Sequence, residues 1–136
     1  MKINYNEYKV ETLMECRKLT INNLEMLANK WNKKQDLLNR AKKKVVEERN
    51  AKNVDRVFKY EQQILEIYYE MGREGNDLVK LNDGIVMVVR KELDEMEEQR
   101  QKEVSLLQRG IIDASEMTYD VERWIELIKI LGEVER

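Results

Sequence analysis

Hydrophobic residues recur along the first third of the chain in alternating steps of three and four positions. This spacing is the heptad pattern of a helix that packs along one stripe against another helix. The first stripe comprises Val10, Leu13, Arg17, Thr20, Leu24, Leu27, Trp31, Lys34, Leu38, Ala41 and Val45. A second stripe, offset by one residue, comprises Val46, Asn50, Asn53, Val57, Tyr60, Ile64, Ile67 and Met71. Together they predict helix over residues 4–71, and Asn4 with Glu7 is placed to cap its start.

The two stripes meet in the polar stretch EERNAKN, residues 47–53. The pattern allows either one helix across 4–71 or two helices hinged at 50–53. Neither proline nor glycine interrupts the stretch, and we therefore favour one continuous helix.

The stretch MGREGND contains the first clear turn signal. Gly72 and Gly75 tolerate left-handed backbone conformations, and Asn76 can cap the helix that follows. We expect a turn at 72–76 and a helix over 77–109, which Gly110 ends. Asp113 and Glu116 form an Asp-type capping box for a last helix over 113–131.

These elements predict an all-α fold, an elongated antiparallel helical bundle or coiled-coil hairpin in a single domain of residues 1–136. The composition agrees with this fold, because the chain has no proline and five glycines, and 38% of its residues are charged.

The stretch LNDGIVMVVRKE, residues 81–92, allows two interpretations. The Asn-Asp-Gly triplet is typical of a β-hairpin turn, but a lone hairpin is marginal in water. The run continues the heptad phase of Leu78 and Leu81, and we favour helix. A helix that is apolar from Ile85 to Val89 presents hydrophobic side chains in nearly every direction. It must therefore be covered either by helix 113–131 or by a second copy of the chain.

We hypothesise that this run and the last helix form a protein interface in a non-enzymatic interaction module. Such a module would be an adaptor, a chaperone-like factor or an inhibitor of a larger protein. We also expect self-association into a dimer or higher oligomer. The predicted interface comprises Ile85, Val86, Val88, Val89, Val121, Trp124, Ile125 and Ile128.

Charge is distributed unevenly along the chain. Residues 29–60 hold eleven basic and four acidic residues, a net charge of +7, and residues 91–136 hold seven basic and thirteen acidic residues, a net charge of −6. A turn at 72–76 would bring the two segments together, for example Arg56 beside Glu92, and we favour this internal pairing. The alternative functions are nucleic-acid binding through the basic helix 30–59, or nucleic-acid mimicry through residues 91–136. Nucleic acid is the less favoured partner, and its candidate contacts are Lys30, Lys33, Lys34 and Arg40.

The residues that most enzymes need are scarce. The chain has no histidine, which removes the commonest general base and metal ligand. We therefore expect no catalytic, metal or cofactor site. The single cysteine, Cys16, fits a reduced, cytoplasmic setting, and no apolar run is long enough to span a membrane. Richness in Lys, Asn and Glu suggests a bacterial or phage accessory protein.

Overall fold

The computed structural model describes residues 3–118 and 120–135. It contains three α-helices: α1 (Val10–Glu47), α2 (Ala51–Gln108) and α3 (Val121–Val134). Two short 3-10 helices, η1 (Tyr5–Glu7) and η2 (Ala114–Glu116), precede α1 and α3. No strand occurs in the described part of the chain, so the all-α prediction is confirmed and the stretch from Leu81 to Glu92 is helix.

The chain packs as two compact units. The hairpin unit comprises Cys16–Lys80, and the terminal unit comprises Met1–Glu15 with Leu81–Arg136. The hairpin unit therefore interrupts the sequence of the terminal unit, and α1 and α2 each contribute residues to both. The prediction of a single domain is not tested by this division.

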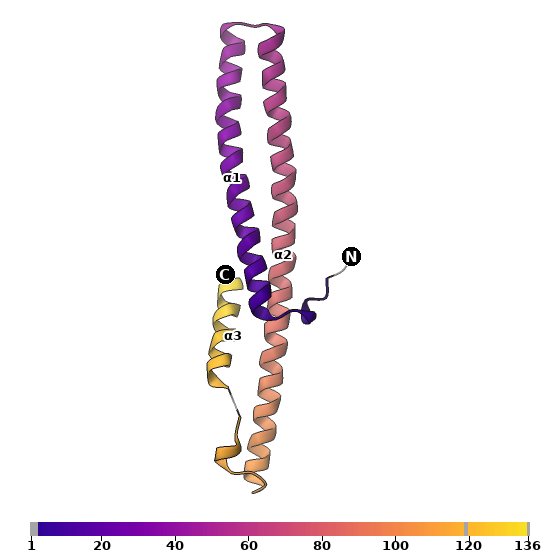
Figure 1. Cartoon of the computed structure of the whole chain (residues 1–136), viewed down its shortest axis with the longest axis vertical. Helices are drawn as coiled ribbons and strands as arrows, with labels where there is room; N and C mark the ends of the chain where they lie inside the picture. The colour runs from indigo at the N-terminus through magenta and orange to yellow at the C-terminus, as the bar shows by residue number, and fades with distance from the viewer. Residues whose placement is uncertain (1–2, 119, 136) are drawn as a thin grey trace. The chain divides into compact units, whose positions relative to one another are not determined.

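The chain turns between α1 and α2 at residues 48–50 (Figure 1). The Asn50 side chain accepts a hydrogen bond from the Asn53 backbone N–H at 2.9 Å, and the Asn53 amide donates to the Glu48 carbonyl at 2.7 Å. Asn50 is thus the N-cap of α2, because it satisfies a backbone N–H that no helical carbonyl can reach. The favoured continuous helix over 4–71 is wrong, and a break close to the proposed hinge at 50–53 is present.

The predicted turn at 72–76 does not exist, because α2 runs without interruption through Gly72, Gly75 and Asn76. An added Cβ would meet no atom within 4 Å at either glycine. Tertiary packing outweighs the cost of two glycines inside a helix, which is about 1 kcal/mol each. The separate helix predicted over 77–109 is therefore the second half of α2.

The heptad stripes predict the packed face of the hairpin unit well. Leu27, Leu38 and Ala41 of α1 are buried, as are Ile64 and Ile67 of α2. The Trp31 ring lies 6.1 Å from the Tyr68 ring, which fixes the antiparallel register around the 48–50 turn. The exception is Val46, which is 87% exposed because it lies in the last turn of α1 rather than on a second stripe.

The apolar run of α2 forms the centre of the terminal unit. Ile85 and Val89 are completely buried, in contact with a cluster that contains Val10 and Leu13 of α1 and Leu127 of α3. The run is therefore covered from two sides by the same chain. Of the two predicted alternatives, the last helix and a second copy, the last helix is the one that the structure contains.

The helix ends differ from the predicted ones at both termini. Asn4 and Asp113 are N-caps, but each caps a 3-10 turn, and the α-helices begin later in the sequence. Asp120 caps α3 by accepting from the Arg123 backbone N–H at 3.0 Å. The last helix is thus Val121–Val134 rather than 113–131. Gly110 adopts a φ of +72° two residues after α2 ends, as predicted for a glycine that closes a helix.

Candidate functional site

Helix α3 carries hydrophobic side chains on two faces. Leu127 and Val134 are buried in the core of the terminal unit, whereas four large side chains point to solvent. These four lie at positions i, i+3, i+4 and i+7, which place them on one side of the helix. We call them the outward face: Val121, Trp124, Ile125 and Ile128, which are 52%, 41%, 44% and 42% exposed. Contiguous exposed apolar groups of this kind mark interaction surfaces more often than isolated ones do.

The other predicted interface residues lie in a different environment. Ile85 and Val89 are buried within the terminal unit, and Val86 and Val88 are half-buried against the same core. None of these four offers a free surface comparable to the outward face. The sequence pattern placed these four residues and the outward face in one interface, because the pattern does not show which apolar residues the chain covers by itself.

Arg123, whose side chain is largely buried, fixes α3 against α1 and α2. The Arg123 guanidinium donates to both carboxylate oxygens of Glu92 on α2, at 2.8 and 3.1 Å, and to Glu11 on α1. It also lies 3.3 Å from Glu126. The hydrogen bond from Arg123 lowers the pKa of Glu11, and the bonds to Glu92 raise the pKa of Arg123. Because the guanidinium holds α3 in one orientation, the outward face is presented in a fixed direction.

A carboxylate ties the segment before α3 to α2. Glu103 is 4% exposed, and it accepts hydrogen bonds from the Thr118 backbone N–H at 3.1 Å and from the Thr118 hydroxyl. Gln99 also donates to it, at 3.3 Å. These bonds, mainly those from Thr118, lower the pKa of Glu103. Nothing in the sequence pattern indicated that Glu103 and Thr118 are partners.

The outward face is bordered mainly by carboxylates. Glu122 and Glu133 lie on α3 beside it, with Lys129 as the basic residue of that flank. The face is therefore an apolar stripe with an acidic edge.

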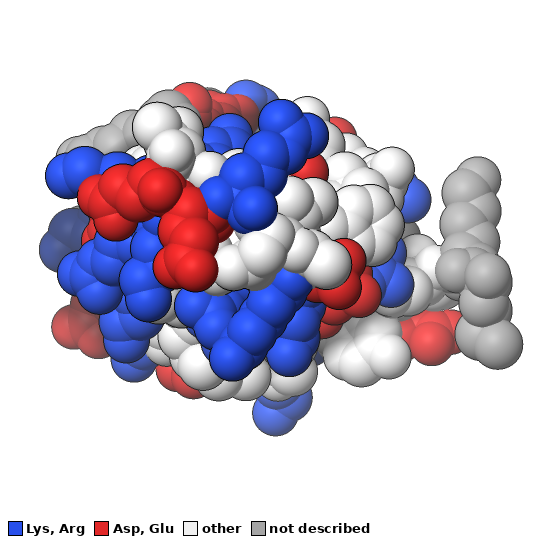
Figure 2. Space-filling model, turned by 90° about the horizontal axis from the view of Figure 1, so that it is seen from above, with Lys and Arg blue, Asp and Glu red and all other residues white. Residues whose placement is uncertain are grey.

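The predicted pairing between the basic and acidic segments is not formed. Glu92 binds Arg123, Glu97 binds Arg100 at 2.7 Å, and Glu103 binds Thr118. The basic segment instead folds on itself, because the turn at 48–50 lies inside it. None of its basic residues forms an ion pair within the described ranges, 3–118 and 120–135, and Figure 2 shows Lys and Arg side chains over much of the face seen from above.

The four candidate nucleic-acid contacts divide into two pairs. Lys30 and Lys34 line hollows between α1 and α2 within the hairpin unit, whereas Lys33 and Arg40 are exposed outside them. The α2 residues that share these hollows are Lys52, Arg56 and Lys59. They lie within the predicted basic helix 30–59, but they were not among its candidate contacts because pairing with the acidic segment was favoured. The Asn50–Asn53 cap was the signal that would have revealed them.

Two further observations concern chemistry and membranes. Within the described ranges, no three side chains of Cys, Asp, Glu or His lie together as a metal site would require, and Cys16 is an exposed free thiol. None of the described helices combines the length and the apolar character needed to cross a bilayer.

Comparison with protein families, curated proteins and solved structures gives no match to this chain. The function of the chain is therefore inferred from the geometry of its own surfaces.

Proposed function

We propose that this protein is a non-enzymatic interaction module whose outward face on α3 binds a larger protein. The observation that carries the proposal is the exposure of Val121, Trp124, Ile125 and Ile128 on one side of a helix that is otherwise anchored. An amphipathic helix that enters a hydrophobic groove uses anchors at this spacing. Trp124 has the side-chain type most often found to dominate binding energy.

The proposed partner has an apolar groove with basic residues along its edge. The acidic border of the outward face, formed by Glu122 and Glu133, would meet these basic residues. Two acidic borders would repel each other if α3 helices of two copies packed in parallel. Complementary charge would also increase the association rate. An adaptor or inhibitor role fits this mode of binding, and cytoplasmic location and bacterial or phage origin remain predictions.

The test combines a site-specific cross-link with measured affinities. A photo-reactive amino acid at position 125 captures the neighbour of the outward face in cells, and the captured protein is then purified. We expect Trp124→Ala with Ile128→Ala to weaken binding of that protein by about 2 kcal/mol or more, roughly thirty-fold. Circular dichroism of the variant should remain helical.

A matched control removes two exposed apolar side chains elsewhere. Leu19 and Met26 are about equally exposed on α1, and Leu19→Ala with Met26→Ala should leave the affinity unchanged. Equal losses in both variants would contradict the proposal. A cross-link solely to a second copy of the chain would replace it with self-association, which light scattering would measure directly.

A further inference from the structure

The turn at 48–50 concentrates basic side chains around one hollow of the hairpin unit. This hollow, which we call the tip groove, has a volume of about 340 Å³ and is lined by residues within 52–63 at the start of α2 and by Lys34 of α1. Four cationic residues line it: Lys34, Lys52, Arg56 and Lys59. Asp55 is the one acidic residue of its lining. Like charges gathered without ion-pair partners raise the free energy of the fold slightly, and a bound polyanion would remove that cost.

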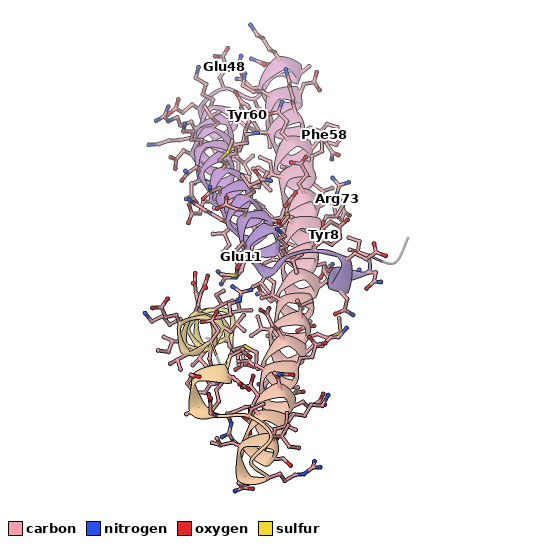
Figure 3. All side chains as sticks on the ribbon, turned by 60° about the horizontal axis from the view of Figure 1, so that its bottom comes forward. Tyr8, Glu11, Glu48, Phe58, Tyr60 and Arg73 are labelled. Carbon is pink, nitrogen blue, oxygen red and sulfur yellow. The ribbon has the colours of Figure 1, made fainter. Side chains whose placement is uncertain are left out.

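Aromatic and amide groups accompany the charges. The Lys34 ammonium lies 5.7 Å from the centre of the Tyr60 ring. The groove therefore combines a cation with an aromatic ring. Tyr60 lies on the side of α2 that faces α1, whereas Phe58 points away from α1 (Figure 3). The Gln63 side-chain oxygen is buried without a hydrogen-bond partner. A base N–H that reached this oxygen would supply the missing donor, because an unpaired buried acceptor raises the free energy of the protein.

A second hollow adjoins the first. It has a volume of about 760 Å³ and shares Lys34 and Gln63 with the tip groove. Lys30, Tyr69 and Arg73 add two cations and another aromatic ring, and the carboxylates of Glu66 and Glu70 offset these two positive charges. From Lys52 to Arg73 the path along α2 is about 32 Å at 1.5 Å per residue.

From these residues we infer that the tip groove binds the backbone of single-stranded nucleic acid, a role distinct from that of α3. Proteins that bind single strands without base readout combine a basic groove with aromatic rings on which bases stack. The groove has a volume of about 340 Å³, which suits the backbone of one strand better than a duplex. An anionic membrane surface is less suitable, because its contact would need apolar side chains beside the cations, and neither Phe58 nor Leu65 lines the groove.

The test measures binding of a fluorescein-labelled 20-nucleotide oligodeoxythymidine by anisotropy over a range of salt concentrations. Four neutralised phosphates give a slope of about −3 in a plot of log affinity against log salt, because each phosphate contributes about −0.7 for a single strand. Lys52→Gln with Arg56→Gln should weaken binding at low salt about ten-fold or more and bring the slope to about −1.4.

The matched control removes the same charge outside the groove. Lys42 and Lys43 are exposed on α1 and do not line it, and Lys42→Gln with Lys43→Gln should change the affinity by less than about three-fold. An equal loss in both variants would overturn the inference, because it would show that only total charge matters. Absence of binding at low salt would also overturn it. So would tighter binding to a 20-base-pair duplex, or to vesicles that contain phosphatidylserine, than to the single strand.

Discussion

Glycines of α2 that look alike in the sequence have different surroundings in the structure. A Cβ built on Gly84 would lie 2.5 Å from the Tyr5 ring, whereas one on Gly72 or Gly75 meets no atom within 4 Å. Gly84 thus allows η1 to approach α2 closely, and Tyr5 packs against the core of the terminal unit. The glycine inside the NDG triplet is explained by this contact rather than by a turn.

We therefore expect opposite effects from two glycine-to-alanine substitutions. Gly72→Ala should stabilise the protein by about 0.5–1 kcal/mol, because alanine is the better helix former and the site is open. Gly84→Ala should destabilise it by about 1–3 kcal/mol, because Tyr5 must move. Thermal unfolding followed by circular dichroism measures both, and a stabilised Gly84→Ala variant would show that Tyr5 does not pack as described.

Arg123 provides a second prediction at single-residue scale. Lysine retains the positive charge but cannot donate two parallel bonds to Glu92 while it reaches Glu11. Arg123→Lys should lower the unfolding free energy by about 1 kcal/mol. Arg90→Lys is the control, because Arg90 forms a single bond to Glu135 at the surface, and it should change stability by less than about 0.5 kcal/mol.

At the scale of helices, periodicity predicted which residues are packed but not where the chain turns. The stripe from Val10 to Val45 comprises buried or half-buried residues throughout. The turns were misplaced because glycine was weighted above asparagine. Gly72 and Gly75 lie in a helix whose packing outweighs their propensity, and the true turn depends on side-chain bonds of Asn50 and Asn53. Pairings such as Glu103 with Thr118 depend on that topology and therefore could not be inferred.

The two faces of α3 predict a contrast between neighbouring residues. Leu127→Ala should lower the unfolding free energy by about 3 kcal/mol, because the side chain is completely buried. Ile128→Ala should lower it by less than about 1 kcal/mol, because Ile128 faces solvent. Chemical denaturation of the two variants measures the difference, and similar losses would mean that the outward face is covered in the free protein.

At the scale of the whole molecule, acid should act first on the terminal unit. Glu11, Glu97, Glu103 and Asp113 have lowered pKa values, and all four belong to that unit. For Glu97 the hydrogen bonds from Arg100 and Gln101 lower the pKa to about 2. A carboxylate with a lowered pKa stabilises the fold above its unfolded pKa of about 4. This contribution is lost as the pH falls through the lower folded value.

Each unit contains one tryptophan, Trp31 in the hairpin unit and Trp124 in the terminal unit. Variants Trp31→Phe and Trp124→Phe therefore report on the two units separately by fluorescence. We expect the Trp124 signal to change at a higher pH than the Trp31 signal when the protein is acidified below pH 4.5. Glu103→Gln should reduce the pH dependence of the Trp124 signal. Simultaneous transitions in both variants would contradict the assignment.

The insertion of the hairpin unit between the two halves of the terminal unit has a consequence for the order of folding. During synthesis on the ribosome, residues 16–80 emerge before the residues of α2 and α3 that contact Val10 and Leu13 have been synthesised. The hairpin contacts are local around one turn, and contacts of this kind form fast. Once the hairpin has formed, Glu15 and Leu81 are held near each other, and the entropy cost of closing a loop of 65 residues is already met. We therefore expect the basic hairpin to fold before the unit that presents α3.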